Sequence, residues 1–241
     1  MIPILPEKHL GGNYIVNNQI SFSLKKNENM KHEWKKAEKQ LYLPARNPEL
    51  VNVPAFNFFT IEGKGNPNDA HFAEFIGVLY SLSYAIKMSP KKGFAPDGNF
   101  DYTVYPLEGV WDLTEEARKT YDGAFDKNDL VFKLMMRQPS FVDNGFALKM
   151  LELTKKNKSH DLLEKVKFEE VAEGKCIQML HLGSYDSEPA SFSLMEQFAD
   201  KTGYKRVAKT HREIYLSDAR KVSADKLKTV LRFRVEKSRF L

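Results

Sequence analysis

The same order of secondary-structure elements occurs twice in this sequence. Each half has the pattern of a strand, a turn with a glycine, an amphipathic helix and two more strands. The predicted strands span residues 55–61, 101–111 and 130–136 in the first half and 175–182, 210–216 and 228–235 in the second. We therefore expect an α+β fold of two pseudo-symmetric strand-helix-strand-strand units, with an antiparallel sheet and a ligand cavity at the seam between them.

Two pairs of residues support the duplication. Gly63 and Gly183 each precede a predicted helix, and the position of Glu108 in the first half corresponds to that of Glu213 in the second. Glycine allows the tight turn that each unit needs between its first strand and its helix. The shared order therefore predicts that Glu108 and Glu213 have related places in the two units.

The repeat sets the expected domain boundaries. The halves span about residues 53–158 and 168–237, inside a single domain at 30–237. Residues 1–29 are weakly patterned, so we expect an N-terminal extension outside the core. The alternative is that the short β-prone runs in this segment, residues 14–16 and 20–24, supply an edge strand.

The charge is unevenly distributed and bears on the partners. Residues 200–241 carry 13 Lys and Arg against 5 Asp and Glu. A basic segment can meet nucleic acid. No recognition helix, zinc finger or aromatic-basic motif accompanies it, however, so we expect a solvated surface and no nucleic-acid partner.

Cysteine use and hydropathy bear on the compartment. Cys176 is the single cysteine and sits in an apolar run, which predicts a buried thiol and no internal disulfide. The sequence has no apolar run of about 18 residues and no signal-peptide pattern. We therefore expect a cytoplasmic protein with no membrane partner.

The most informative strand is the one at 210–216. Alternation places His211, Glu213 and Tyr215 on one face, opposite Ile214 and its neighbours. A carboxylate in the middle of a strand is costly unless it is used or paired. Glu213 is thus the first candidate for a functional residue, with Tyr215 beside it. The alternative is a structural ion pair with a cross-strand arginine such as Arg232.

The first half offers further candidates. If Gly109 forms a β-bulge, Trp111 turns onto the face of Glu108, and both can line a ligand site. The alternative for Trp111 is a core position. Tyr80 and Tyr84 lie on a helix stripe opposite the Phe and Ile stripe, which fits either a pocket wall or a second buried face.

His181 and Tyr185 flank the turn at Gly183 and complete the candidate ligand-binding set. His181 suits either a catalytic base or a hydrogen-bonded structural histidine. The 6 histidines are scattered without zinc-ligand spacing, so we predict no metal. Dinucleotide, phosphate-loop and serine-nucleophile motifs are missing from the sequence, so we predict no cofactor.

Five segments then carry a family resemblance. They are IEGKGNPN, FIGVLYSLSYAIKM, PLEGVW, HLGSYDS and HREIYLSDARKVSADKLKTVLRFRV, in this order. With them, residues 30 to 237 resemble the GyrI-like small-molecule-binding domain of the stand-alone bacterial type. The resemblance implies a cavity between the two units with aromatic walls and an acidic residue inside. The family pattern usually has proline where this chain has Ala219, a difference confined to a turn.

The resemblance also implies a range of functions. Members bind amphipathic, often cationic compounds, and some stand-alone members hydrolyse cyclopropane-bearing genotoxins. For this chain it implies detoxification, with Glu213 activating water and Tyr215 donating a hydrogen bond. The alternatives are a non-catalytic protein that sequesters or senses ligands, or a modulator of a protein partner such as a DNA topoisomerase. The sequence does not choose between binding and hydrolysis.

Overall fold

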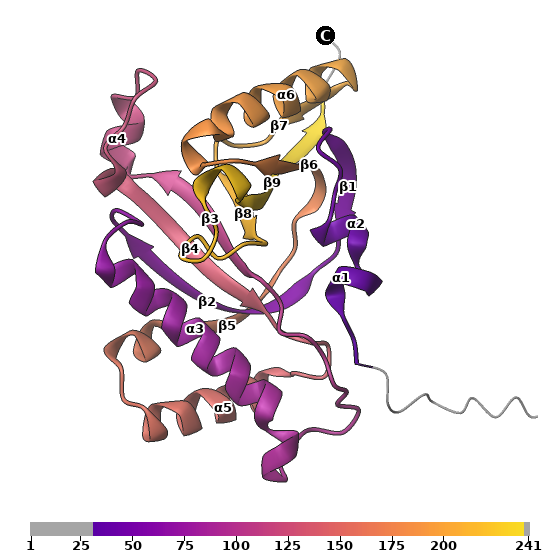
Figure 1. Cartoon of the computed structure of the whole chain (residues 1–241), viewed down its shortest axis with the longest axis vertical. Coiled ribbons are helices and arrows are strands. Elements are labelled where there is room, and N and C mark those ends of the chain that lie inside the picture. Colours follow the sequence, from indigo (N-terminus) through magenta and orange to yellow (C-terminus); the bar gives the residue numbers. More distant parts are fainter. Residues whose placement is uncertain (1–30, 239–241) are drawn as a thin grey trace, which may run out of the picture.

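The computed structural model describes residues 31–238, which form one sheet with helices packed on it (Figure 1). The predicted N-terminal extension at 1–29 lies outside the described residues. The strands are β1 (Glu49–Val53), β2 (Phe56–Lys64), β3 (Leu107–Leu113), β4 (Leu130–Arg137), β5 (Lys167–Val171), β6 (Gly174–Leu182), β7 (Tyr204–Arg206), β8 (His211–Tyr215) and β9 (Lys228–Lys237). Their order in the sheet is β1-β6-β9-β8-β3-β4-β2-β5, with β7 paired to β9.

The α-helices are α1 (Trp34–Ala37), α2 (Lys39–Tyr42), α3 (Ala70–Met88), α4 (Glu115–Lys119), α5 (Asn144–Asn157) and α6 (Glu188–Lys201). Short 3-10 helices are η1 (Pro90–Lys92), η2 (Lys127–Asp129), η3 (Asp161–Lys165), η4 (Tyr185–Ser187) and η5 (Ala224–Lys226). Within residues 31–238, no helix has the length and apolarity that crossing a membrane requires.

The two predicted units are present and meet at a single strand pair. β2, β4 and β3 lie together in the first unit, and β6, β9 and β8 in the second. β3 and β8 pair antiparallel, with Gly109 opposite Glu213 and Trp111 opposite His211. β1 and β5 extend the symmetry, because each precedes one unit in the chain and pairs with the outer strand of the other. The α+β fold with two pseudo-symmetric halves is thus confirmed.

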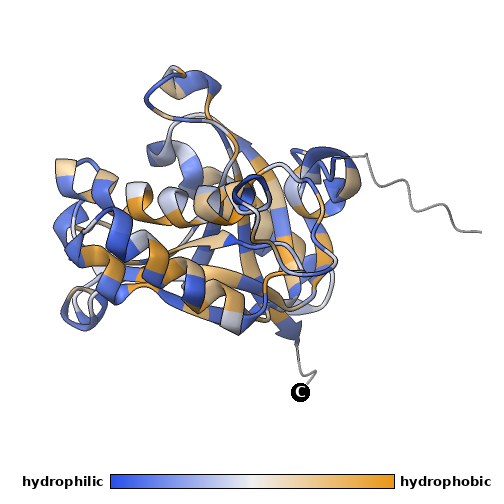
Figure 2. Cartoon of the chain, turned by 90° about the horizontal axis from the view of Figure 1, so that it is seen from below, coloured by the Kyte–Doolittle hydropathy of each residue, from blue (hydrophilic) through white to orange (hydrophobic). Residues whose placement is uncertain are grey.

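The long helices α3 and α6 cover the same face of the sheet. Directly paired residues share a face, so Phe132 of β4, Trp111 of β3 and His211 of β8 all point to one side. In the first unit, Phe75 of α3 contacts Phe132, and in the second, Met195 of α6 packs with residues of β6 and β9. Figure 2 shows hydrophobic residues along the long helices where they run beside the sheet. The β3–β8 seam lies between the part of the sheet that α3 covers and the part that α6 covers.

Candidate functional site

A hydrogen bond across the seam organises the candidate site. Trp111 Nε1 on β3 donates to Tyr215 Oη on β8 at 2.7 Å. Trp111 is 6% exposed, and Tyr215 is partly buried. The bond joins the two units directly, and it fixes the direction of the phenol beside Glu213.

Gly109 allows this bond for a reason other than the predicted bulge. A Cβ at position 109 would lie 2.9 Å from Trp111 Nε1 and 3.0 Å from Tyr215 Oη. The glycine therefore permits a close approach of side chains. The register between β3 and β4 is continuous from Leu107 to Leu113, without a bulge. The expectation that Trp111 and Glu108 share a face is therefore wrong: Trp111 keeps the face of Gly109.

Glu213 lies in the middle of this group. It is 7% exposed, and His211 Nε2 is 3.0 Å from its Oε1. Glu188, the first residue of α6, is 5% exposed, and its Oε1 has no hydrogen-bond partner within the described residues. Donor atoms of Glu188, His211 and Glu213 all lie within 4.8 Å of one another. This trio is the place in the described chain where a metal ion could be held, and two carboxylates with one imidazole suit zinc or manganese.

Burial and like charge set the protonation of these groups. Burial first, and then the Glu213 charge, raise the pKa of the Glu188 carboxyl well above its usual range. Burial, with the Glu213 charge, also raises the pKa of Tyr215. The same causes raise the pKa of Tyr185 to about 12. The phenols therefore stay protonated near neutral pH, where they can donate hydrogen bonds.

Aromatic rings surround the carboxylates. Tyr185 meets Tyr215 edge to face with ring centroids 6.1 Å apart, and Phe192 of α6 meets His211 at 4.6 Å. On the other side, Phe72 of α3 lies 5.8 Å from the Trp111 ring. Such rings offer faces to a flat or cationic ligand. Tyr185 is itself 39% exposed, so it can contact a molecule that approaches from solvent.

The remaining predicted residues on this side have other surroundings. His181 is 4% exposed, with Nδ1 2.9 Å from Ser191 Oγ and Nε2 3.0 Å from the Ser184 carbonyl. Its hydrogen bonds are those of the structural alternative. Tyr80 and Tyr84 of α3 stack with ring centroids 6.3 Å apart; Tyr80 is half-buried against the core, and Tyr84 is exposed. Burial, the neighbouring Tyr84 phenol and the charge of Asp218 raise the pKa of Tyr80. Asp218 belongs to the loop after β8, so Tyr80 lies beside that loop.

Glu108 is not brought to this group. It pairs with Ile214 in the β3–β8 register, on the opposite face from Glu213. There it is 1% exposed and accepts a hydrogen bond of 2.7 Å from Arg212 Nη1. Arg212 also contacts Glu173, which pairs with Arg232. Arg232, which the structural alternative would pair with Glu213, is thus engaged on the other face.

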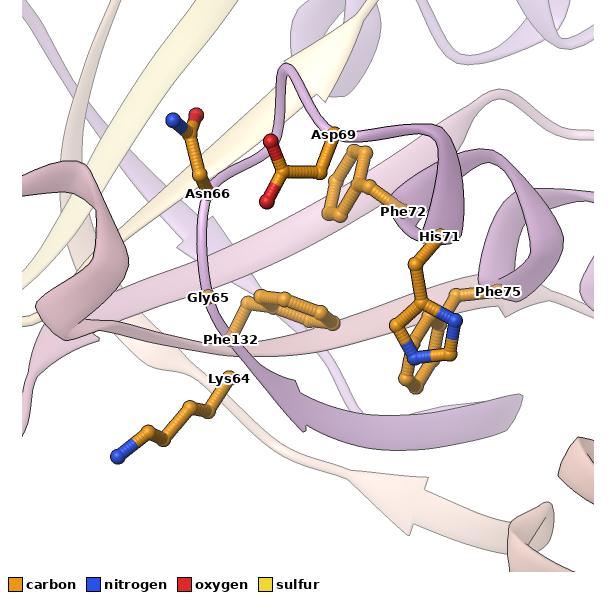
Figure 3. A pocket seen from close by; sticks show the side chains of 8 residues that line it. All are labelled: Lys64, Gly65, Asn66, Asp69, His71, Phe72, Phe75 and Phe132. Atoms are coloured by element: carbon orange, nitrogen blue, oxygen red, sulfur yellow. The ribbon is translucent and has the colours of Figure 1, made fainter.

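The structure contains a hollow beside the seam, at the turn between β2 and α3 (Figure 3). Its lining residues are Lys64, Gly65, Asn66, Asp69, His71, Phe72, Phe75 and Phe132. Phe72 and Phe132 also contact the Trp111 ring, at 5.8 and 5.4 Å between centroids. Two rings of the hollow therefore also contact Trp111, the hydrogen-bond partner of Tyr215.

Sequence reasoning missed Glu188, and it did not include His211 among the candidate site residues, although alternation places His211 on the face of Glu213. A glutamate in the first turn of a helix is ordinary, since it complements the helix dipole. Nothing in the spacing of Glu188 and Glu213 along the chain indicates that their carboxyls meet. Only the packing of α6 on the sheet of the second unit brings them together.

Known proteins place this architecture in a family. The family model for the GyrI-like small molecule binding domain matches residues 46–236. A solved structure described as a hydrolase from Listeria innocua is 34% identical, covers 86% of this chain and 100% of its own, and superposes with a TM-score of 0.76. An uncharacterized conserved protein from the same organism is 35% identical over the same shares, also with a TM-score of 0.76. No curated protein matches the chain.

The family match covers most of the chain, and it agrees with the fold. The two units joined at β3–β8, with helices α3 and α6 on one face, form the domain that the match describes. The chain belongs to the family of the GyrI-like small molecule binding domain.

Proposed function

We propose that the chain binds amphipathic aromatic or cationic small molecules at Glu213 and hydrolyses strained electrophiles, such as cyclopropane-bearing compounds, in detoxification. The observation that carries the proposal is a carboxylate, 7% exposed, beside the Trp111–Tyr215 pair at the seam of a small-molecule-binding domain. The description of a 34% identical relative as a hydrolase supports the catalytic part.

In the proposed reaction, water adds across a strained carbon–carbon bond. Glu213 takes a proton from water while the water oxygen bonds to a ring carbon. The ring bond breaks, and its electron pair moves onto a carbonyl oxygen conjugated with the ring. That oxygen gains a proton, the proton on Glu213 is released, and the net change is the addition of one water without oxidation or reduction. General-base help of this kind is worth about 10²–10⁴ in rate.

Tyr215 and Trp111 can act on the carbonyl oxygen that receives the electron pair of the broken ring bond. The Tyr215 oxygen accepts a hydrogen bond from Trp111, so the phenol proton is left to donate. Its raised pKa keeps that proton in place at neutral pH. A donor aimed at an oxygen that gains charge stabilises the transition state more than the ground state. We assign this role to Tyr215 and the task of holding it in place to Trp111.

A non-catalytic ligand-sequestering function is the second candidate. Its support is that a buried carboxylate next to Tyr185 and Trp111 is sufficient to hold a cation, since ring faces attract cations by about 0.5–2 kcal/mol. This function needs the same residues but no attacking water. The two candidates differ only in whether the ligand leaves changed.

Mass spectrometry of a cyclopropane-bearing compound incubated with the protein separates them. Hydrolysis adds the mass of one water, and the Glu213→Gln variant should reduce the rate by about 10²–10⁴ while the compound still binds. The matched control is Glu170→Gln, on an exposed position of β5. Unchanged compound, together with binding seen in a thermal-shift assay, would establish sequestration. A Glu213→Gln variant with the wild-type rate would exclude Glu213 as the base.

A further inference from the structure

The trio of Glu188, His211 and Glu213 stands apart from the other ionisable groups of the protein. Each side chain offers one donor atom, and the three atoms lie within 4.8 Å of one another. Within residues 31–238, no other group of three or more His, Cys, Asp or Glu side chains meets this condition. The prediction of no metal used the spacing of histidines and cysteines, whereas two of these three donors are carboxylates.

The fold holds all three side chains on regular elements. His211 and Glu213 alternate on β8, so both point to the face that α3 and α6 cover. Glu188 is the first residue of α6, which packs on the sheet of the second unit. The Phe192 ring contacts the His211 imidazole edge to face, with centroids 4.6 Å apart. Donors on strands and helices are held more precisely than donors on loops, so the trio can receive an ion with little rearrangement.

The spacing of the donors fits a tetrahedral ion. Zinc binds imidazole nitrogen and carboxylate oxygen at about 2.0–2.2 Å, so two donors of one tetrahedron lie roughly 3.3 Å apart. His211 Nε2 and Glu213 Oε1 are 3.0 Å apart, which is close to that separation. A Glu188 oxygen lies within 4.8 Å of both atoms, so a small rotation of its side chain completes the triangle.

A second observation, independent of the spacing, concerns the Glu188 Oε1 atom. Glu188 is 5% exposed, and this oxygen has no hydrogen-bond partner in the described part of the chain. A buried carboxylate oxygen without a donor or a cation is costly. Among the described ion pairs, Glu213 contacts His211, and neither glutamate contacts a lysine or an arginine. A divalent cation would give Oε1 a partner and balance the charge of both carboxylates.

We propose that Glu188, His211 and Glu213 bind a divalent transition metal, with zinc as the best match. An imidazole with two carboxylates suits zinc or manganese, whereas magnesium and calcium favour sites made of oxygen donors. Such donors bind zinc more tightly than manganese. Three protein donors leave one position for water or another small ligand. The inference goes beyond the proposed function, because zinc can bind whether or not an organic ligand does.

Zinc in this site would compete with the proposed reaction. Once Glu213 binds the ion, its oxygen lone pairs are engaged, and it cannot take a proton from water. Zinc should therefore slow the hydrolysis of a cyclopropane-bearing compound, with the same concentration dependence as zinc binding. Faster hydrolysis in the presence of zinc would support the metal site and contradict Glu213 as the general base.

Calorimetric titration of the chelator-treated full chain with zinc chloride tests the site directly. Wild type should bind one zinc ion at the trio. Glu188→Gln and His211→Ala should each lower the zinc affinity at least about 100-fold, because loss of a group that only orients a metal ligand already costs about 10–100-fold. The matched controls remove an exposed glutamate of β5, in Glu170→Gln, and an exposed histidine of α3, in His71→Ala. Both controls should bind zinc as wild type does.

Two further measurements test the proposal if a variant folds poorly. Cobalt(II) can take the place of zinc, and wild type with cobalt should have the visible absorption bands of a four-coordinate ion. Zinc should also raise the melting temperature of wild type and leave that of Glu188→Gln unchanged.

Two results would overturn the metal site. One is a wild-type protein that binds no zinc. The other is equal zinc affinity in wild type, Glu188→Gln and His211→Ala, which would show that zinc binds only at other histidines. Neither result depends on an organic ligand, so failure of the proposed function is seen separately, as a protein that binds zinc at the trio and neither binds nor hydrolyses any compound.

Discussion

Trp111 Nε1 and Tyr215 Oη are joined by a hydrogen bond of 2.7 Å that crosses the seam between the two halves of the domain. One partner belongs to β3 and the other to β8, so the bond depends on the pairing of the two units. It also turns a phenol that stays protonated toward the buried Glu213. The stability of the seam and the geometry of the candidate site therefore both depend on this hydrogen bond.

Replacing Gly109 by alanine should break this contact. The added Cβ would lie 2.9 Å from Trp111 Nε1 and 3.0 Å from Tyr215 Oη, so one ring has to move. We expect a loss of about 1–3 kcal/mol in the free energy of unfolding, measured with urea, and weaker ligand binding. The matched control is Gly77→Ala on α3, where a Cβ meets nothing within 4 Å and alanine favours the helix. A Gly109→Ala variant as stable as wild type would contradict the close packing.

Glu108 and Glu213 should respond in opposite ways to mutation. Glu108→Ala leaves Arg212 buried without its 2.7 Å partner, so we expect a loss of about 3–5 kcal/mol in unfolding free energy, with ligand binding kept in the molecules that remain folded. Glu213→Gln should impair hydrolysis with a much smaller change in stability. Urea titration and ligand titration of both variants check this. Loss of binding in Glu108→Ala at full stability would show that Glu108 contacts the ligand after all.

The pKa of Glu188 makes stability depend on pH with a defined sign. Its folded pKa is raised well above 4.5, so the folded protein binds more protons than the unfolded chain between the two values. The stabilisation linked to this proton is complete below about pH 4.5 and is lost as pH rises through the folded pKa. Glu188→Gln cannot ionise, so its stability relative to wild type should increase with pH over that window. If the melting temperatures of the two proteins change with pH in the same way, the pKa of Glu188 is not raised.

Tyr185 should ionise late. Burial and the charges of Glu213 and Glu188 raise its pKa to about 12 from an ordinary 10. Because the Glu213 charge is one of the causes, Glu213→Gln should lower that pKa. Ultraviolet titration of wild type, Glu213→Gln and Tyr185→Phe isolates the Tyr185 signal by difference. An ordinary pKa in wild type would place Tyr185 in solvent, away from the carboxylates.

The fold was accessible from sequence because its signals are local and occur twice. Alternation put Glu213 and Tyr215 on one strand face, and the structure has them there, with His211. The face of Trp111 was not accessible, because Gly109 fits both a bulge and a close side-chain approach. Only the Tyr215 ring, which comes from the other unit, distinguishes a bulge from a close side-chain approach at Gly109.

Long-range contacts explain what else the sequence could not yield. Glu188 meets Glu213 because α6 packs on the second unit, and Arg212 reaches Glu108 because two distant strands pair. The duplication suggested equivalent roles for Glu108 and Glu213. In the antiparallel seam, however, Gly109 is the residue opposite Glu213, and Glu108 falls one residue away on the reverse face.

The most direct test of Glu213 as the general base is a crystal structure of the Glu213→Gln variant with a cyclopropane-bearing compound bound. We expect the strained ring at the β3–β8 seam, with an ordered water between residue 213 and a ring carbon and the Tyr215 hydroxyl toward the conjugated oxygen. A compound bound instead in the hollow at the turn between β2 and α3, away from residue 213, would contradict it.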